Sequence, residues 1–300
     1  MKINQRTLAL IAVSIATLIY GVNYTIAKEV MPLYVKPFGF ILIRVIGATT
    51  IFWILGLFIK SQKLDKADYK TLLLASFFGV GLNMLSFFKG LSLTTPISAS
   101  VMMVTSPILV LIFSSILIRK PIGRQRVLGV IIGLIGTVLL ITYGNAADSN
   151  ATNSNLGNFL VFVNAASYGL YLVISKNLIV KYHPIFLVKW LYLLGLIFTI
   201  PFGYNELMEV SWLEMPVNIY WNIGFVVVFT SCITYLFNLY GLSKLKPTTV
   251  SVFIYLQPVI ATIYALIVGS DSLNLVKICA TLLIFLGVYL VTKQVEKSSK

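Results

Sequence analysis

The stretch GLSLTTPISASVMMVTSP, residues 90–107, occurs a second time as GLSKLKPTTVSVFIYLQP, residues 241–258. The two copies lie 151 residues apart in a chain of 300 residues, and seven of their 18 positions are identical. A sequence repeat at an offset of half the chain length indicates that one structural unit occurs twice. The fold must therefore be interpreted as two similar halves.

The composition is typical of an integral membrane protein. Hydrophobic residues make up 58% of the chain and charged residues 11%, whereas soluble domains contain roughly 25% charged residues. Apolar runs of about 20 residues, the length that crosses a bilayer as a helix, recur along the whole chain. The sequence predicts an all-α integral membrane protein with no separate soluble domain.

The apolar runs predict ten transmembrane helices. They are expected at residues 7–29, 37–59, 70–91, 96–117, 126–143, 156–177, 185–204, 219–240, 247–268 and 273–292. The first five-helix repeat then occupies 7–143 and the second 156–292. A polar external loop at 144–155 connects them, and a cytoplasmic tail follows at 293–300.

The positions of Lys and Arg predict the orientation in the membrane. Seventeen of them fall on the side of the two termini, whereas the opposite connections hold only Lys28, Lys36 and Lys277. Because short cytoplasmic connections are enriched in Lys and Arg, we expect both termini inside and a multi-pass protein of the cytoplasmic (plasma) membrane. The net charge of +14 then follows from topology, and no nucleic-acid partner is expected.

Each half contains an odd number of predicted helices, so the second half should enter the membrane upside down. Tyr20 of the first helix recurs as Tyr168 in the sixth. Lys28 recurs in the same way as Lys176. Two inverted five-helix repeats typically place a substrate site near the middle of the membrane, where the halves meet.

The doubled motifs resemble those of the EamA family in the drug/metabolite transporter superfamily. They are an aromatic-Gly-x-Asn-aromatic pattern at 20–24, the Gly-Leu pairs at 90 and 241, Arg44, Pro107 and Pro258. The resemblance implies a ten-helix transporter that moves small metabolites, commonly outward, across the cytoplasmic membrane. The chain departs from the family where a Gly-Glu pair often follows the fourth and ninth helices. The acidic residue is absent after the fourth predicted helix. After the ninth, Asp271 only approximates it.

Polar side chains recur inside the predicted helices, where hydrocarbon offers them no partner. We expect them to face a cavity, with hydrogen bonding between helices as the alternative. The candidate substrate-binding residues are Tyr20, Asn23, Arg44, Asn83, Met102, Thr105, Tyr168, Tyr171, Thr234, Asn238, Tyr255 and Gln257.

Two prolines occupy equivalent places inside the fourth and ninth predicted helices. Pro107 and Pro258 each remove one helical hydrogen bond and free a carbonyl four residues earlier. We predict that both mark helix breaks beside the substrate pathway. The alternative is that they are structural, because membrane helices tolerate proline in general.

Arg44 lies seven residues into its predicted helix, a depth of about 10 Å at a rise of 1.5 Å per residue. It is expected either to reach the interface as an anchor or to attract a carboxylate or phosphate of the substrate. No Asp or Glu falls near the predicted midplane of any span. Because such carboxylates usually carry protons or sodium, we expect facilitated diffusion or exchange.

The sequence offers no sign of a cofactor, a metal site or catalysis. Cys232, Cys279 and His183 do not have metal-ligand spacing, and no GxxxxGK[ST] loop for ATP is present. We predict a secondary transporter, an exporter or exchanger of small metabolites such as amino acids, working by alternating access. Its partners would be the substrate and the lipid bilayer, and it would be a monomer or weak homodimer. The alternatives are an intramembrane enzyme acting on lipid-linked substrates and a non-transporting membrane scaffold.

Overall fold

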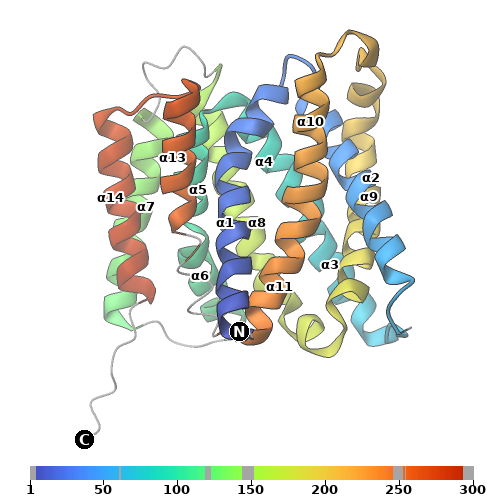
Figure 1. Ribbon diagram of the computed structural model, residues 1–300. Helices are drawn as coiled ribbons and strands as arrows, with labels where there is room; N and C mark the ends of the chain where they lie inside the picture. Colours follow the sequence, from blue (N-terminus) through green and yellow to red (C-terminus); the bar gives the residue numbers. More distant parts are fainter. Residues whose placement is uncertain are drawn as a thin grey trace, which may run out of the picture.

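The apolar runs of the sequence form helices because, in lipid, backbone N–H and C=O groups must be satisfied within the segment. The computed structural model is a helical bundle (Figure 1). It describes residues 5–60, 62–118, 123–143, 152–245, 253 and 255–292. No strand occurs within these ranges.

Eight helical spans of the described chain are long and apolar enough to cross a membrane. They are Gln5–Val30 (α1), Pro37–Gly56 (α2), Lys66–Leu93, Pro96–Leu117, Arg124–Tyr143 (α7), Ser154–Lys181 (α8), Pro184–Met208 (α9) and Val217–Asn238. Two shorter apolar helices follow, Leu256–Val268 (α13) and Leu275–Thr292 (α14). Residues 246–252, where the ninth predicted span begins, lie outside the described residues. The same holds for most of the predicted loop at 144–155 and for the tail at 293–300.

Three of these spans contain an interruption. The third comprises a 3₁₀ turn, Lys66–Asp68 (η1), then Tyr69–Ser76 (α3), the π-helical Phe77–Gly81 (η2) and Leu82–Leu93 (α4). The fourth divides into Pro96–Met103 (α5) and Ser106–Ile118 (α6). The eighth comprises Val217–Phe225 (α10), the π-helical Val226–Ile233 (η4) and Thr234–Lys244 (α11), preceded by a 3₁₀ turn at Trp212–Glu214 (η3).

The two π-helical segments fall at equivalent points of the repeat. Adding the offset of 151 residues to η2 gives residues 228–232, which lie inside η4. A π-helical turn inserts a residue into an α-helix and leaves local carbonyls with poorer partners, and such turns are frequent at functional sites. Both halves therefore carry the same local irregularity.

Helix starts and ends follow ordinary sequence signals. Pro37, Pro96 and Pro184 each open a helix at its first position, where the missing N–H has no intrahelical partner to lose. Asn153 caps α8 by accepting a hydrogen bond from the Leu156 N–H at 3.2 Å. Gly269 ends α13 with a left-handed φ of 71°, a conformation that favours glycine.

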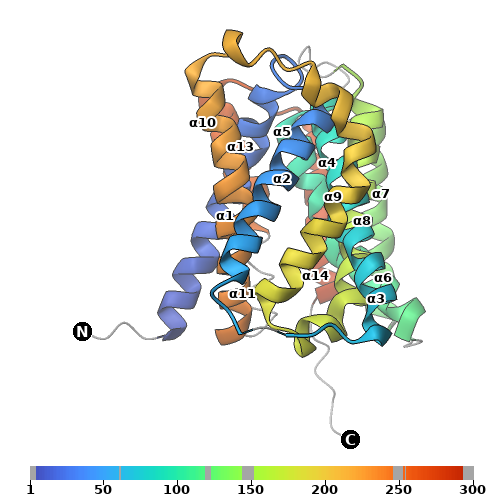
Figure 2. The same cartoon turned by 90° about the vertical axis from the view of Figure 1, so that its right-hand side faces the viewer.

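The helices of the two halves pack against each other in a reciprocal pattern. α2 contacts α9 and α7 contacts α14, while α4 packs on α8 and α11 packs on α1 (Figures 1 and 2). The first helix of each half thus packs on the third span of the other half. Helices α7 and α14 approach closely because glycines face each other: a Cβ on Gly287 would lie 2.5 Å from the Gly133 backbone nitrogen. Gly129 and Gly133 thus make a close helix contact within the chain.

Contacts at the α4–α5 junction show that α1 and α8 run in opposite directions. Lys28, near the end of α1, donates from Nζ to the Thr94 carbonyl at 2.8 Å. Asn153, which begins α8, donates from its backbone N–H to the Leu93 carbonyl at 3.3 Å. The start of α1 and the end of α14 lie together at the opposite end of the bundle (Figure 2). We call that end the terminal end, and the end that contains Lys28 the far end.

Candidate functional site

A cavity of about 270 Å³ lies between the two halves. From the first half it is lined by α1, α2, η2, α4, α5 and α6. From the second half it is lined by α8, α9, η4, α11 and α13. Pockets for drug-sized ligands usually span about 300–1,000 Å³. The volume therefore suits a small metabolite.

Eight of the residues singled out from the sequence line this cavity. They are Tyr20, Asn23, Arg44, Asn83, Tyr168, Tyr171, Asn238 and Gln257. They come from both halves of the chain, although they are as far apart in sequence as Tyr20 and Gln257. The fold thus gathers polar side chains from the repeated segments around one space.

The other candidates lie outside the cavity lining. Met102, Thr105 and Thr234 are fully buried between helices, and the Tyr255 ring packs on Phe285 with centroids 6.1 Å apart. The Thr234 hydroxyl donates to the Thr230 carbonyl. These side chains occupy packing positions.

The predicted helix breaks also stand next to the cavity rather than in its lining. The fourth span is interrupted at Val104–Thr105, so Pro107 is the second residue of α6, and Pro258 is the third residue of α13. The Met103 carbonyl, which Pro107 cannot reach, accepts a hydrogen bond from the Ser106 hydroxyl at 2.7 Å. Met103 and Ser106 line the cavity, each one position beyond the candidates Met102 and Thr105.

Arg44 points into the bundle rather than along its surface. It is 8% exposed, its Nε donates to the Ser231 hydroxyl at 2.7 Å, and its Cζ lies 5.3 Å from the centroid of the Phe88 ring. No carboxylate of the described residues lies within 4.0 Å of it. The cavity therefore holds a buried cation without a counter-ion in the described chain.

Three asparagines of the cavity lining form hydrogen bonds with neighbouring helices. Asn23 Oδ1 accepts a hydrogen bond from the Thr230 hydroxyl at 2.9 Å. Asn164 and Asn83 exchange bonds: Asn164 Nδ2 donates to the Asn83 carbonyl at 2.8 Å, and Asn83 Nδ2 donates to the Asn164 carbonyl at 3.3 Å. Asn164 is 2% exposed, and none of the described residues forms a hydrogen bond with its Oδ1.

Several lining residues were missed by the sequence analysis. Thr230 and Ser231 of η4 line the cavity, as do Tyr192 and Tyr235, and the Tyr235 and Tyr171 hydroxyls lie 3.4 Å apart. The adjacent Thr230 and Ser231 were detectable as two polar residues in an apolar run. The tyrosines carried no comparable signal, because aromatic residues are common throughout membrane helices.

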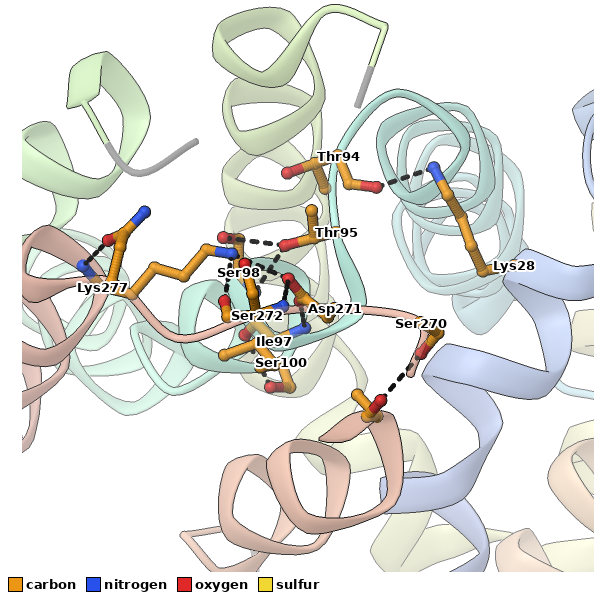
Figure 3. Close-up of polar contacts among 12 residues, drawn as sticks. Lys28, Thr94, Thr95, Ile97, Ser98, Ser100, Ser270, Asp271, Ser272 and Lys277 are labelled. Atoms are coloured by element: carbon orange, nitrogen blue, oxygen red, sulfur yellow. Dashed lines mark hydrogen bonds and ion pairs between the residues drawn. The ribbon is translucent and has the colours of Figure 1, made fainter. Parts of the chain in front are cut away.

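A buried ion pair of the second half contacts the first half at the far end (Figure 3). The Asp271 carboxylate accepts from the Ile97 backbone N–H at 2.9 Å and pairs with Lys277 Nζ at 2.8 Å. The two side chains are 0% and 1% exposed. Since Ile97 lies in the first turn of α5, the carboxylate also meets the positive end of that helix. Asp271 thus fixes the α13–α14 connection to the start of α5.

Lys28 holds the neighbouring end of α4 (Figure 3). Its Nζ donates to the carbonyls of Leu91, Ser92 and Thr94 at 2.8–3.0 Å. These are the carbonyls that a helix leaves without partners at its C-terminal end. Its repeat counterpart Lys176, near the terminal end, is exposed, and no hydrogen bond joins it to another described residue. Within the described part of the chain, the contacts of Lys28 at the far end therefore have no equivalent around Lys176.

Comparison with known proteins places these features in a family. The EamA-like transporter family matches residues 7–142 and 155–293. The uncharacterized transporter YyaM of Bacillus subtilis (strain 168) is 26% identical over 230 residues, which cover 77% of this chain and 75% of that protein. An uncharacterized transporter of Archaeoglobus fulgidus is 26% identical over 285 residues, which cover 95% and 98% of the two chains.

A solved crystal structure of a protein shares the fold. Its TM-score is 0.62 with 16% sequence identity, and the match covers 99% of this chain and 100% of the other. The relatives named above carry the name of transporters, and the family match includes both halves of the chain. The protein is a multi-pass membrane protein that belongs to the EamA-like transporter family.

Proposed function

We propose that the protein is a secondary transporter, an exporter or exchanger, of small metabolites such as amino acids. The observation that carries this proposal is the cavity between the halves, in which Arg44 is buried among polar side chains of both. The chain would work by alternating access, exposing the cavity to one side of the membrane and then to the other.

Support for two inverted repeats comes from the packing of the helices. α1 and α8 run in opposite directions, and each packs on the third span of the other half. Such an arrangement lets the halves rock about a site on their common axis. We further propose that the terminal end faces the cytoplasm and that the membrane is the plasma membrane, as the distribution of Lys and Arg predicts.

The binding role of Arg44 follows from its surroundings. A guanidinium group remains charged at any physiological pH and pairs well with carboxylate or phosphate oxygens. Burying it without a counter-ion is costly, and an anionic group of the substrate would offset that cost. The lining residues contain no Asp or Glu in the described chain, so we expect facilitated diffusion or exchange rather than carboxylate-based proton coupling.

The test is solute flux in liposomes that contain the purified protein. A panel of amino acids and organic acids is assayed for uptake and for exchange against empty liposomes. Flux above the empty control supports transport. If no solute moves although some of them raise the melting temperature of the protein, the non-transporting scaffold is favoured instead.

The Arg44→Gln variant tests the site itself. We expect it to lower flux of anionic substrates about tenfold or more, because a hydrogen bond to a charged group contributes about 1.5–3 kcal/mol. Lys189→Gln is the matched control: Lys189 lies 4.9 Å from the Trp53 ring centroid and outside the cavity lining. Equal flux in Arg44→Gln and the wild type would remove Arg44 from the binding site.

A further inference from the structure

We propose that α2 and α9 form a fixed pair that does not separate during transport, and that the cavity opens and closes by movement of the other lining helices. This inference rests on the proposed alternating access and deepens it, because it names the part of the site that keeps its structure in both states. The observation behind it is that α2 and α9 make equivalent contacts at both ends of the bundle in one structure.

The two helices occupy equivalent places in the repeat. An offset of 147 residues converts Pro37, the first residue of α2, into Pro184, the first residue of α9. The start of α2 meets the end of α9, where Phe38 and Gly39 donate from their backbone N–H groups to the Glu206 carboxylate at 2.6 and 2.9 Å. α2 and α9 are thus the antiparallel second helices of the two halves.

Glycine provides the same close contact at both ends of the pair. At the far end, a Cβ on Gly203 would lie 2.8 Å from the Leu42 Cβ. At the terminal end, a Cβ on Gly56 would lie 3.1 Å from the Lys189 Cδ. The offset of 147 residues converts Gly56 into Gly203 and also Leu42 into Lys189. The two helices therefore pack closely through the same positions of the repeat at both ends.

The polar residues beyond the helix ends follow the same pattern. Lys36, which precedes α2, pairs with the carboxylate of Glu209, which follows α9. His183, which precedes α9, donates from its backbone N–H to Gln62 Oε1 at 2.8 Å beyond the end of α2. The same offset converts Lys36 into His183 and Gln62 into Glu209. The ion pair is exposed and contributes little stability, but the connections at both ends are in contact at the same time.

The inverted repeat distinguishes contacts that persist from contacts that must change. In such a transporter, each half takes in one state the arrangement that the other half has in the opposite state. A contact that both halves already make is therefore the same before and after the exchange. The α2–α9 contacts are of this kind. The contacts of Lys28 with the end of α4 are not, because Lys176 forms no hydrogen bond with a described residue.

The fixed pair carries part of the substrate site. Arg44 of α2 and Tyr192 of α9 both line the cavity, so their mutual position should be the same in both states. The other walls include α1 with α11 and α4 with α8, which pack as two further pairs. Movement of these pairs about α2 and α9 would expose the substrate first at one end of the bundle and then at the other.

Reversible cross-links test whether the fixed pair separates. In a background without the two native cysteines, one link joins Lys36→Cys to Glu209→Cys and a second joins Gln62→Cys to His183→Cys. A short bifunctional methanethiosulfonate forms each link through disulfides that dithiothreitol breaks, and the loss of free thiols shows that linking is complete. Flux of the panel of amino acids and organic acids is measured in liposomes. With both links in place it should stay within about twofold of flux after reduction, because no step of the cycle separates the pair.

A link from Lys28→Cys to Ser92→Cys is the matched control, because it fixes a contact between α1 and α4 that must change. It should lower flux about tenfold or more, since it holds the far end closed, and reduction should restore the flux. Flux that is lost with either α2–α9 link and restored by reduction would overturn the inference. Full flux with the control link would also overturn it. If the control variant does not fold, the two α2–α9 links decide alone.

Spin labels distinguish this inference from the proposed function. If the unlinked protein moves no solute of the panel, the transport function fails. Labels on the same two pairs of cysteines, at 36 with 209 and at 62 with 183, still measure whether α2 and α9 separate. We expect one short distance at each end of the pair, both without solute and with each solute of the panel. A second, longer distance at either end would overturn the inference whether or not the liposomes show flux.

Discussion

Asp271 and Lys277 form the most deeply buried ion pair of the described chain, with both side chains at 0–1% exposed. Such a pair contributes little net stability compared with apolar residues of similar shape, but removing one partner leaves a charge buried alone. The residue that only approximates the family's acidic position therefore has a structural role: it holds the start of α5 against the α13–α14 connection.

We predict that Asp271→Asn lowers the free energy of unfolding by about 3–5 kcal/mol, the usual cost of an uncompensated buried charge. The measurement is the apparent melting temperature in detergent. The double variant Asp271→Asn with Lys277→Met should be less destabilised than Asp271→Asn alone, because no unpaired cation remains. A double variant that is less stable by the sum of both single effects would show that the pair is not coupled.

At the scale of helices, the contact between α7 and α14 depends on glycine. A Cβ at Gly287 would lie 2.5 Å from the Gly133 nitrogen and 2.7 Å from the Gly129 carbonyl oxygen, and backbone atoms cannot move aside. We predict that Gly287→Ala destabilises the protein by about 1–3 kcal/mol, the usual cost of overpacking. Gly224→Ala is the control, since nothing lies within 4 Å of its added Cβ. Equal melting temperatures of the two variants would contradict the prediction.

Lys28 and Lys176 suggest how the helices exchange contacts during transport. In this structure Lys28 holds the end of α4, whereas its counterpart Lys176 on α8 is exposed. If the halves are related by inverted symmetry, the transporter should have a second state that is open to the other side of the membrane. In that state Lys28 should lose its hydrogen bonds, and Lys176 should donate to the carbonyls at the end of α11. The two lysines would then hold alternate states.

We predict that Lys28→Met makes the far end more accessible to water. Ser92→Cys is introduced in a background with Cys232→Ala and Cys279→Ala, because Ser92 is 5% exposed beside Lys28. Labelling by a membrane-impermeant maleimide should then rise severalfold with Lys28→Met. Lys176→Met should leave labelling unchanged or lower it. Unchanged labelling in Lys28→Met would show that Lys28 does not close the far end.

At the scale of the whole molecule, hydropathy and the repeat predicted the helical membrane fold, because span length and helix propensity depend on local sequence. The cavity lining was harder to predict. The candidates Met102 and Thr105 are fully buried, and their neighbours Met103 and Ser106 line the cavity instead. Which face of a helix meets the cavity depends on packing against distant helices. Tyr192 and Tyr235 could not be selected, because their place in the lining depends on contacts between distant helices.

The lone formal charge of Arg44 among the described lining residues has an electrical consequence. If the protein carries a monoanion by facilitated diffusion, each cycle moves one negative charge across the membrane. A membrane potential of 100 mV, negative inside, changes the free energy of moving one charge across the membrane by about 2.3 kcal/mol. We predict that a potassium diffusion potential imposed with valinomycin drives a monoanion such as 4-methylpentanoate toward the positive side of the liposome membrane. The distribution of a zwitterion such as leucine should not respond.

That coupling would set the direction of transport without any ion-binding site. At equilibrium, about 2.3 kcal/mol corresponds to a roughly fifty-fold higher concentration of the anion outside the cell. A cavity with one uncompensated arginine would thus let the resting voltage of the cell expel an organic acid, and the cell would spend no further gradient to do so.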